Sequence, residues 1–517
     1  MEKIATSILH SIPSGLSLLS SFLLYRVLLV VYRLYFHPLS RIPGPKLAAA
    51  TTLYVAYYDV YKNGTFLRDA LPALHKKYGP VVRISPTEVQ IHQPELYHRV
   101  NAMHSPFIKD PVYYGSIGVS SSAFGTTDQS LHRSRRSLIN PMFSKRRILE
   151  ASTIMQDVVM KLCTILETFC DSNKPVPLSN AFYCVTVDTI TAYTFGESWN
   201  MLDEPNFTSE WVESVLSFAG MVQAKIQFPR ALGVLEALGK VFPSLTPLAF
   251  IKLIQYCENR VQQALEDDAA AKAAGIPPKE RPDTIYDALL YPPSEKAQRP
   301  SYEELVGESI SMVTAGTDTS ATVLQFLAWH FLTRPEVQEK LLQELATVEA
   351  EPNGLLPLKR LEELPYLTGF IKETLRYNTP APGRQNRIVP EGGLTIPSTG
   401  AFLPAGTRIA FCVGMLHHDP RIFEDPAEFR PERWMGQKGK ELDKWMLAFS
   451  KGDRVCVGIN LAYAELHLVV ANLFSRFKLE LFETTKEDLE CVDHFVGHLK
   501  GRIKVIASRR EREAMMV

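Results

Sequence analysis

The chain has 517 residues, of which 46% are apolar and 22% charged, values typical of a globular protein with a large core. Because 56 basic residues balance 56 acidic ones, the composition argues against a nucleic-acid-binding protein, which needs excess positive charge. The seven cysteines are dispersed without framework spacing. That pattern indicates reduced thiols in the cytosol rather than a disulfide scaffold.

The N-terminal segment, residues 1–35, is strongly apolar and is predicted to be a membrane anchor. About 20 apolar residues span a bilayer, and residues 8–29 provide that length, with Arg26 near the end where its side chain can reach the headgroups. More basic residues follow this span than precede it, so the positive-inside rule leaves the rest of the chain on the cytosolic side. A cleaved signal peptide is the alternative, but no small-residue cleavage site is evident.

The next segment, residues 36–48, holds three prolines and a glycine, which predict a stiff hinge after the anchor. No later stretch separates two cores, so residues 49–508 are predicted to form one large domain. The charged tail, residues 509–517, is predicted to be frayed.

Within the domain, residues 81–84 and 88–91 flank a Ser-Pro-Thr turn and predict a β-hairpin. Helical periodicity dominates from about residue 145 to 375, interrupted by a predicted surface connection at residues 267–281. Short strand-like pieces return from residue 394.

A run of basic residues lies at positions 129–147, which contain no acidic residue. The basic residues are Arg133, Arg135, Arg136, Lys145, Arg146 and Arg147. In a chain of zero net charge this run predicts a local basic patch, for which a solvated helix face is the default interpretation.

A long central helix is predicted from Ser301 to about Thr333. Ser301 and Glu304 have the spacing of a capping box, and Pro335 stops the helix. At thirty-odd residues it would measure about 48 Å, enough to cross a whole domain.

The middle of that helix reads Ala-Gly-Thr-Asp-Thr-Ser over residues 315–320. Small and polar residues are poor helix formers, and Gly316 costs about 1 kcal/mol relative to alanine. Thr319 can donate a hydrogen bond back to the carbonyl of Ala315 and loosen the helix there. These residues predict either a kink or close helix crossing, or a groove that admits small molecules.

Glu373 and Arg376 stand three residues apart on one predicted helix face. Alone, such a pair is an ordinary salt bridge, worth under about 1 kcal/mol at a surface. Residues 431–434 read Pro-Glu-Arg-Trp, and Arg433 among them is a candidate third member of the pair.

The most specific motif is Phe-x-x-Gly-x-Arg-x-Cys-x-Gly over residues 449–458. A predicted helix, residues 459–474, begins just after Cys456, and its positive end, with Arg454, would favour the thiolate form. One cysteine without a CxxC or histidine pair lacks the ligands for zinc or an iron–sulfur cluster. A single axial thiolate suits haem iron, whereas a buried structural cysteine is the alternative.

The cysteine motif resembles the haem-binding loop of the cytochrome P450 family, and residues 315–320 resemble that family's motif on its central helix. Ile-Pro-Gly-Pro at residues 42–45 resembles the hinge of microsomal members. The resemblance covers nearly the whole chain. It implies a mainly α fold with small β-sheets, a single large haem domain on an N-terminal transmembrane helix.

The resemblance implies haem b as cofactor, with Cys456 as the axial ligand of its iron. Residues implied beside the cofactor are Phe449, Ala315 and Gly316. The two propionates would be held by Arg136, Arg387 and Arg454. His132 stands where the family usually has tryptophan, and a histidine can still donate to a propionate.

Two further sets of residues receive roles through the resemblance. Asp318 and Thr319 would form the acid–alcohol pair that delivers protons to iron-bound oxygen. Glu373, Arg376 and Arg433 would form a structural network that locks the chain behind the cysteine loop.

The reaction implied is insertion of one oxygen atom of O2 into a C–H or C=C bond of a hydrophobic small molecule. The residue patterns of the N-terminal and central motifs resemble those of filamentous-fungal oxygenases of secondary metabolism, including the trichodiene-oxygenase type. A terpenoid, or else a polyketide or alkaloid intermediate, is therefore the expected substrate. Residues 107–124, 311–315 and 379–384 are expected to line its pocket, and they are mainly apolar or small.

Electrons are expected from another protein, because the chain has no flavin or GxGxxG signature. The resemblance implies NADPH–cytochrome P450 reductase, with cytochrome b5 as an optional second donor, and the basic patch at residues 129–147 would steer the acidic reductase. A monomer in the endoplasmic reticulum membrane, with one span and a cytosolic catalytic domain, is expected.

Two alternatives remain at this point. A haem-thiolate enzyme that rearranges peroxides or reduces nitric oxide would need no external oxygenation cycle, although the intact Asp318–Thr319 pair and the anchor argue against it. A non-catalytic haem sensor belongs to another class, and NADPH-dependent turnover with a reductase separates it from a monooxygenase.

Overall fold

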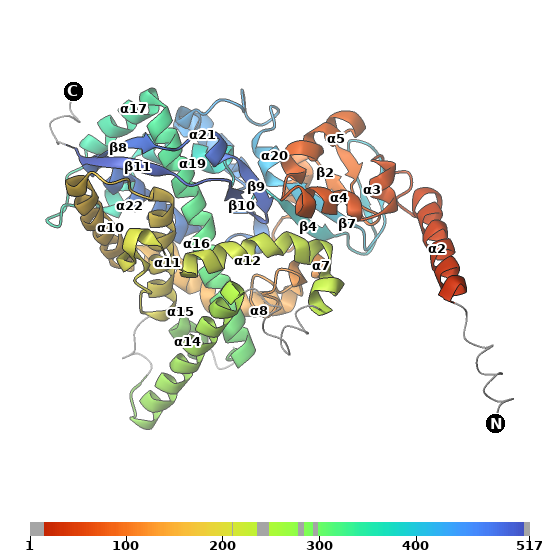
Figure 1. Cartoon of the computed structure of the whole chain (residues 1–517), viewed down its shortest axis with the longest axis horizontal. Coiled ribbons are helices and arrows are strands. Elements are labelled where there is room, and N and C mark those ends of the chain that lie inside the picture. The colour runs from red at the N-terminus through yellow and green to blue at the C-terminus, as the bar shows by residue number, and fades with distance from the viewer. Residues whose placement is uncertain (1–14, 209, 235–247, 278–283, 293–297, 511–517) are drawn as a thin grey trace.

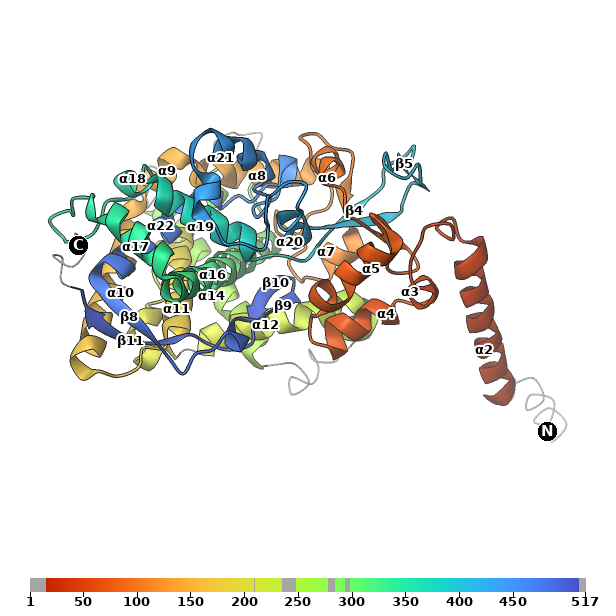
Figure 2. The ribbon, with the colours of Figure 1, turned by 90° about the horizontal axis from the view of Figure 1, so that it is seen from above.

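The computed structural model describes residues 15–208, 210–234, 248–277, 284–292 and 298–510. Long helices form most of the body, and small sheets lie among them (Figures 1 and 2). Helix α2 stands apart at one end of the molecule, and strands β8 and β11 lie toward the other end. The expectation of a mainly α fold with small sheets is confirmed.

The helices of the N-terminal third are mostly short. They are α2 (Gly15–Val31), α3 (Lys46–Ala50), α4 (Leu53–Ala56), α5 (Leu71–Tyr78), α6 (Pro94–Val100), α7 (Pro111–Gly115), α8 (Gln129–Ile139) and α9 (Lys145–Glu150). The middle and C-terminal helices include the longest ones. They are α10 (Ser152–Ser172), α11 (Leu178–Phe195), α12 (Glu210–Gln227), α14 (Leu248–Ala273), α15 (Ile285–Leu290), α16 (Tyr302–Thr333), α17 (Pro335–Ala346), α18 (Leu358–Leu361), α19 (Pro365–Tyr377), α20 (Val413–His417), α21 (Gly436–Leu442) and α22 (Ile459–Arg476).

The strands are short and assemble residues from distant parts of the chain. They are β1 (Val81–Arg83), β2 (Glu88–Ile91), β3 (Ile108–Lys109), β4 (Arg384–Ile388), β5 (Leu394–Thr395), β6 (Phe402–Leu403), β7 (Arg408–Cys412), β8 (Phe477–Phe482), β9 (Cys491–His494), β10 (Val496–Leu499) and β11 (Lys504–Arg509). The largest sheet has the order β1-β2-β7-β4-β3, in which only β2 and β7 run parallel. Pairs β9–β10, β8–β11 and β5–β6 form two-stranded sheets.

Helix α16 forms as predicted and organises the core. The Ser301 hydroxyl accepts from the Glu304 N–H while the Glu304 carboxylate accepts from the Ser301 N–H, and α17 begins at Pro335. The 32 residues of α16 pass between α11, α14, α19 and α22, so most of its side chains are buried. The hairpin β1–β2 and helix α22 also confirm their predictions.

The N-terminal region can be compared with its prediction from residue 15 onward. Among the described residues, the helical window that is apolar and long enough to cross a membrane is Ser17–Phe36, which overlaps the later part of the predicted span at residues 8–29. Residues 1–14 lie outside the described part. The side chains of α2 are exposed, including 61% of Leu24.

The hinge segment is fixed to the domain. The Arg83 guanidinium donates to the carbonyls of Arg33 and Leu39, at 2.9 and 3.3 Å, and Leu39 is buried. A Cβ on Gly44 would stand 2.3 Å from the Arg83 carbonyl oxygen, so only glycine fits there.

Two other boundaries differ from the sequence prediction. The predicted connection at residues 267–281 is helical at its start, because α14 continues to Ala273, and residues 278–283 lie outside the described part. In the tail, Arg509 ends β11 and Arg510 donates to the carbonyl of Phe474, whereas residues 511–517 are not described.

Candidate active site

The cysteine motif forms a tight loop that ends at the start of α22. The Cys456 N–H donates to the Phe449 carbonyl at 2.8 Å, which closes the loop, and the Phe449 ring lies 5.2 Å from that of Tyr463 on α22. Gly452 has φ +64°, and a Cβ there would lie 2.3 Å from the carbonyl oxygen of Asn101. The loop therefore needs glycine at this position to approach the segment after α6.

The Cys456 side chain is accessible, unlike the other cysteines, which are buried or partly buried. Its pKa is nevertheless raised, because desolvation outweighs the opposing effects of the Gly458 N–H and of Arg136. The cation that acts on the thiol is therefore Arg136, where the sequence suggested Arg454. Coordination by a metal would act in the opposite direction, because a coordinating thiol is deprotonated.

The three predicted propionate-binding arginines lie together, and the structure adds a lysine. Arg136 comes from α8, Arg387 from β4 and Arg454 from the cysteine loop, and Lys109 on β3 joins them. The charges of the three arginines all lower the pKa of buried Lys109, in addition to the larger effect of desolvation. We call these four residues the cation cluster.

The hydrogen bonds of the cation cluster go to neutral acceptors. Arg454 donates to the carbonyls of Thr126 and Thr127 at 2.6 and 3.1 Å, and Arg136 donates to that of Val455 at 3.0 Å. The remaining acceptors, for Arg387 and Lys109, are Tyr114 Oη, Asn101 Oδ1, the Asn386 carbonyl and the Phe124 carbonyl. Arg136 also donates to the side-chain oxygen of Asn140.

None of the four cations forms an ion pair within the described part of the chain. Burying like charges without a counter-ion is costly, so the donor set fits a ligand with two carboxylates. The propionates of haem would provide that charge, and the accessible thiol of Cys456 would provide a ligand for its iron. The residues present therefore fit the cofactor.

His132 lies with the cation cluster. It is buried on α8 and lines a small cavity together with Arg387 and Arg454. Desolvation, followed by the charges of Arg454, Arg136 and Lys109, lowers the pKa of His132 to about 3. The imidazole is therefore neutral and can offer one N–H.

The middle of α16 exposes a narrow strip in otherwise buried surroundings. Ala315 is accessible, and Gly316 and Thr319 are partly so, whereas most of the helix around them is buried. Thr319 Oγ1 donates to the Ala315 carbonyl at 2.8 Å, as the sequence predicted. A Cβ on Gly316 would stand 2.6 Å from Ile190 Cγ1 of α11, so this glycine allows a close helix crossing.

Asp318 points away from that strip. It is buried, and its Oδ1 accepts from Tyr183 Oη of α11 at 3.3 Å. Burial raises the pKa of Asp318 to about 7, although Tyr183 and then Arg502 act in the opposite direction. The structure thus places Asp318 and Thr319 on different sides of α16.

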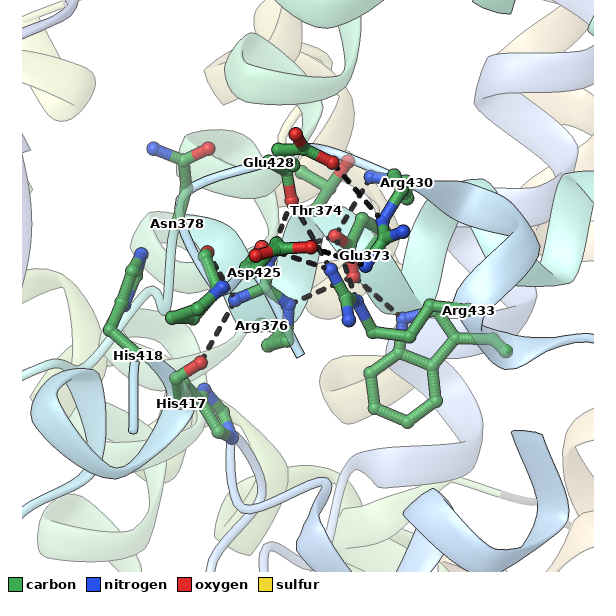
Figure 3. A network of polar contacts seen from close by, with 12 residues as sticks. Glu373, Thr374, Arg376, Asn378, His417, His418, Asp425, Glu428, Arg430 and Arg433 are labelled. Atoms are coloured by element: carbon green, nitrogen blue, oxygen red, sulfur yellow. Dashed lines mark hydrogen bonds and ion pairs between the residues drawn. The ribbon is translucent and has the colours of Figure 1, made fainter. Parts of the chain in front are cut away.

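The structural network of Glu373, Arg376 and Arg433 assembles around one buried carboxylate (Figure 3). Arg376 Nη2 lies 2.7 Å from Glu373 Oε1, and Arg433 Nε lies 3.5 Å from the same oxygen. Sequence reasoning missed Trp434, whose Nε1 donates to Glu373 Oε2 at 2.9 Å, and the N–H of Arg430, which donates to Oε1 at 2.9 Å.

The arginines of this network also hold the chain that follows α20. Arg376 donates to the carbonyls of His417 and Pro426, both at 2.9 Å, and of Glu428 at 3.1 Å. Arg433 donates to the Glu424 carbonyl at 2.6 Å. We call Glu373 and its partners the Glu373 network.

The predicted basic patch at residues 129–147 is smaller than its sequence suggests. Arg135 turns inward to Glu304 at 2.5 Å, and Arg136 belongs to the cation cluster. The remaining pairs are Lys145 with Glu362, and Arg146 and Arg147 with Glu150. Arg133 is exposed and forms no ion pair with the described residues.

The expected pocket segments are less apolar than predicted. In residues 107–124, the Lys109 ammonium lies 4.0 Å from the ring centre of Phe124, and Tyr113, Tyr114 and Phe124 are close to one another or to Phe495. In residues 379–384, buried Arg384 pairs with Asp59 at 2.7 Å. In short loop segments the sequence has no periodic pattern from which the burial of such charged side chains could be predicted.

The comparisons with known proteins agree with this site. The sequence pattern of the family Cytochrome P450 matches residues 51–505. The chain is 35% identical to the cytochrome P450 monooxygenase MO6277 of Ascocoryne sarcoides, over 90% of this chain and 92% of the relative. It is 32% identical to the cytochrome P450 monooxygenase macH of Penicillium terrestre, over 98% and 100%, and 34% identical to the tryptophan 6-hydroxylase fscE of Fusarium equiseti, over 90% and 91%.

The chain therefore belongs to the cytochrome P450 family. It is a P450 monooxygenase with a haem-iron cofactor, similar to enzymes of fungi.

Proposed function

We propose that this monooxygenase hydroxylates or epoxidises a hydrophobic intermediate of secondary metabolism, using O2 and electrons from NADPH. The observation that carries the proposal is the accessible Cys456 thiol together with a cation cluster, in which Lys109 and Arg387 are buried and Arg136 and Arg454 half-buried, that has no carboxylate partner among the described residues. Haem b, when bound, supplies the oxidising chemistry. Cys456 holds its iron, and Arg136, Arg387 and Arg454 pair with its propionates.

The other site residues manage position and protons. His132 donates one N–H toward the propionates, and Phe449 packs behind the cysteine loop. Ala315 and Gly316 provide a small-residue surface on α16, next to the hydroxyl of Thr319. Asp318, with a pKa of about 7, is the acid that supplies protons by way of Thr319.

A terpenoid is the substrate class that we propose, with a polyketide or alkaloid intermediate as the alternative. One relative is named a tryptophan 6-hydroxylase, so related enzymes also act on aromatic nitrogen compounds. The aromatic side chains of Tyr113, Tyr114, Phe124 and Phe495 favour a largely apolar substrate with few charges.

NADPH–cytochrome P450 reductase is the proposed electron donor, with cytochrome b5 as an optional second one. We propose a monomer anchored by one N-terminal span in the endoplasmic reticulum membrane, with the catalytic domain, residues 49–508, in the cytosol. The apolar, exposed helix α2 supports the anchor. Because most of the basic patch is paired, the reductase contact has to depend on a smaller charged surface than the sequence suggested.

The test is a carbon monoxide difference spectrum of the reduced full chain, followed by product analysis in cells that express it with a reductase and are fed terpenoids under labelled dioxygen. We expect a thiolate-type Soret shift that Cys456→Ser abolishes, and one labelled oxygen atom per product. A spectrum without that shift would reject a haem-thiolate enzyme. Conversion of a hydroperoxide without NADPH would favour a rearranging enzyme, and haem binding without turnover would favour a sensor.

A further inference from the structure

The partner of Asp318 is a tyrosine on a neighbouring helix. Tyr183 and Ile190 are seven residues apart on α11 and therefore share the face that meets α16. Ile190 packs where Gly316 has no side chain, which brings the two helices close together. Tyr183 Oη then reaches Asp318 Oδ1 at 3.3 Å.

This hydroxyl is the only hydrogen-bond donor to the Asp318 carboxyl among the described residues. Tyr183 is itself 3% exposed, and burial raises its pKa far above the ordinary value, so the phenol stays neutral. The side chains of Thr322 and Gln325 act on the pKa of this hydroxyl in the opposite direction to burial, and the Arg502 guanidinium lies 5.3 Å from the ring centre. The tyrosine is thus held in place from several sides.

The charged and titratable groups around Asp318 come from few elements. Tyr183 of α11 and Arg502, which precedes β11, both act on it, and buried Cys491 of β9 feels its charge. Glu465 of α22 faces Ser320 and Thr189 instead. In the described part of α14, α17 and α19, no charged group acts on Asp318.

We propose that Tyr183 is a positioning residue of the oxygenation reaction, which holds the carboxyl of Asp318 on the α11 side of α16 between proton transfers. The proposal rests on the proposed role of Asp318 as proton source. Thr319 lies on the accessible strip and is bonded to Ala315, so the carboxyl must turn from Tyr183 to serve it. The tyrosine therefore sets how readily the acid leaves its resting position.

The variant Tyr183→Phe removes the hydroxyl and keeps the ring. Its matched control is Tyr193→Phe on the same helix, where an equally buried hydroxyl donates to the Met142 carbonyl. Because the lost hydrogen bond favours the ionised form of Asp318, the pKa of that acid should rise by about half a unit to one unit.

The first measurement is an infrared titration of the full-length holoenzyme. The band of protonated Asp318 is identified by its loss in Asp318→Asn, and its disappearance with rising pH reports the pKa. We expect this titration to move to higher pH in Tyr183→Phe and to stay in place in Tyr193→Phe. An Asp318 pKa that is the same in Tyr183→Phe and Tyr193→Phe would overturn the proposal.

The second measurement uses the reconstituted enzyme with reductase, NADPH and dioxygen, without an organic substrate. Peroxide formation consumes one O2, one NADPH and one proton, and the fraction of NADPH recovered as peroxide is followed against pH. We expect a fraction about two- to fivefold higher in Tyr183→Phe, because a carboxyl that is no longer held in place and has a raised pKa delivers its proton less effectively. In the Asp318→Asn background the same substitution should have no further effect, and an undiminished effect there would overturn the proposal.

A variant that keeps a hydrogen-bond donor at position 183 distinguishes loss of the hydrogen bond from a folding defect. Tyr183→Gln should show a peroxide fraction closer to that of the wild type than to that of Tyr183→Phe, and a value equal to the phenylalanine variant would contradict positioning by the donor. The proposed function fails separately, if the wild type shows no thiolate-type spectrum or no reductase-dependent oxidation of NADPH. The infrared shift would remain measurable in that case.

Discussion

Two clusters of arginines in this protein look alike in the sequence and differ in how their charges are compensated. In the Glu373 network, one buried carboxylate and several carbonyls face the guanidinium groups of Arg376 and Arg433. In the cation cluster, Arg136, Arg387 and Arg454 find only neutral acceptors among the described residues. The first cluster is compensated by the polypeptide, whereas we propose that the second is compensated by an anionic ligand.

The comparison indicates that burial does not distinguish an arginine that stabilises the fold from one proposed to bind a ligand. The difference is whether a carboxylate of the protein compensates its charge. Arg376 and Arg387 are both buried, at 0% and 3% exposed. Loss of a partner should therefore destabilise the Glu373 network under all conditions. Loss of a cation from the other cluster should matter mainly when the cofactor is bound.

The largest effect is expected for Glu373→Gln, which leaves Arg376 and Arg433 buried without their carboxylate. Breaking a buried ion pair on one side costs about 3–5 kcal/mol. Denaturant unfolding should show this loss in both haem-free and haem-loaded protein. The control is Glu363→Gln, which removes an exposed pair with Arg360 and should cost no more than about 1 kcal/mol.

The second-largest effect is expected for Lys109→Met in the cation cluster. The substitution should leave the haem-free protein at least as stable, but it should weaken the binding of haem. The haem-free protein should be as stable as the wild type or more so, because one of several like charges is removed. Haem should be lost about tenfold faster or more, since a charge-assisted hydrogen bond contributes about 1.5–3 kcal/mol. Transfer of haem to an apoprotein acceptor measures this rate.

Destabilisation of the haem-free protein by Lys109→Met, with unchanged haem transfer, would contradict the distinction between the clusters. Lys340→Met is the control, because Lys340 is exposed and paired with Glu432.

A smaller effect is expected for Trp434→Phe, which removes one of the donors to Glu373 and keeps most of the ring volume. The remaining donors are Arg376, Arg433 and the N–H of Arg430, so the carboxylate stays compensated. We expect a loss of about 1–2 kcal/mol in denaturant unfolding. A loss as large as that of Glu373→Gln would mean that the indole, rather than the arginines, holds the network.

The smallest effect concerns the pH dependence of His132→Asn in haem-free protein. The pKa of His132 is about 3 in the folded state and about 6.5 when unfolded, so the unfolded state takes up the proton first. Stability is therefore unaffected above about pH 6.5 and falls as the pH decreases below it. His132→Asn should lose less stability over that acidic range, as followed by thermal unfolding.

Bound haem should reduce the difference between wild type and His132→Asn, because its carboxylates offset the cations that lower the pKa of His132. A difference that persists unchanged in the holoenzyme would place His132 away from the propionates.

Local sequence features predicted much of the fold. The capping box at Ser301, the hairpin around residues 81–91 and the helix after the cysteine loop all depend on residues close in sequence, and all three form as predicted. The predicted membrane span at residues 8–29 begins outside the described residues, and its later part falls within the apolar window Ser17–Phe36. The connection at residues 267–281 was misjudged since an alanine-rich run also extends a helix.

The site was predictable only as far as its motifs reach. Lys109 carries no motif and joins the cation cluster only because β3 pairs with β4 beside Arg387. Tyr183 and Trp434 likewise acquire their roles through helix packing and chain return over long sequence separations. The basic patch lost most of its free charge for the same reason, since Glu304 and Glu362 are distant in sequence.

The sequence by itself determined the family, the thiol proposed to hold the iron, the central helix and most of the charged residues at the proposed site. Those features depend on residue types at short, fixed spacing, which the backbone geometry of helices and tight loops imposes locally. Only the tertiary structure decided which charges are compensated, which side of α16 Asp318 faces, and which residue donates a hydrogen bond to it there. Burial and electrostatic pairing depend on every element that packs around a group, and no local pattern records them.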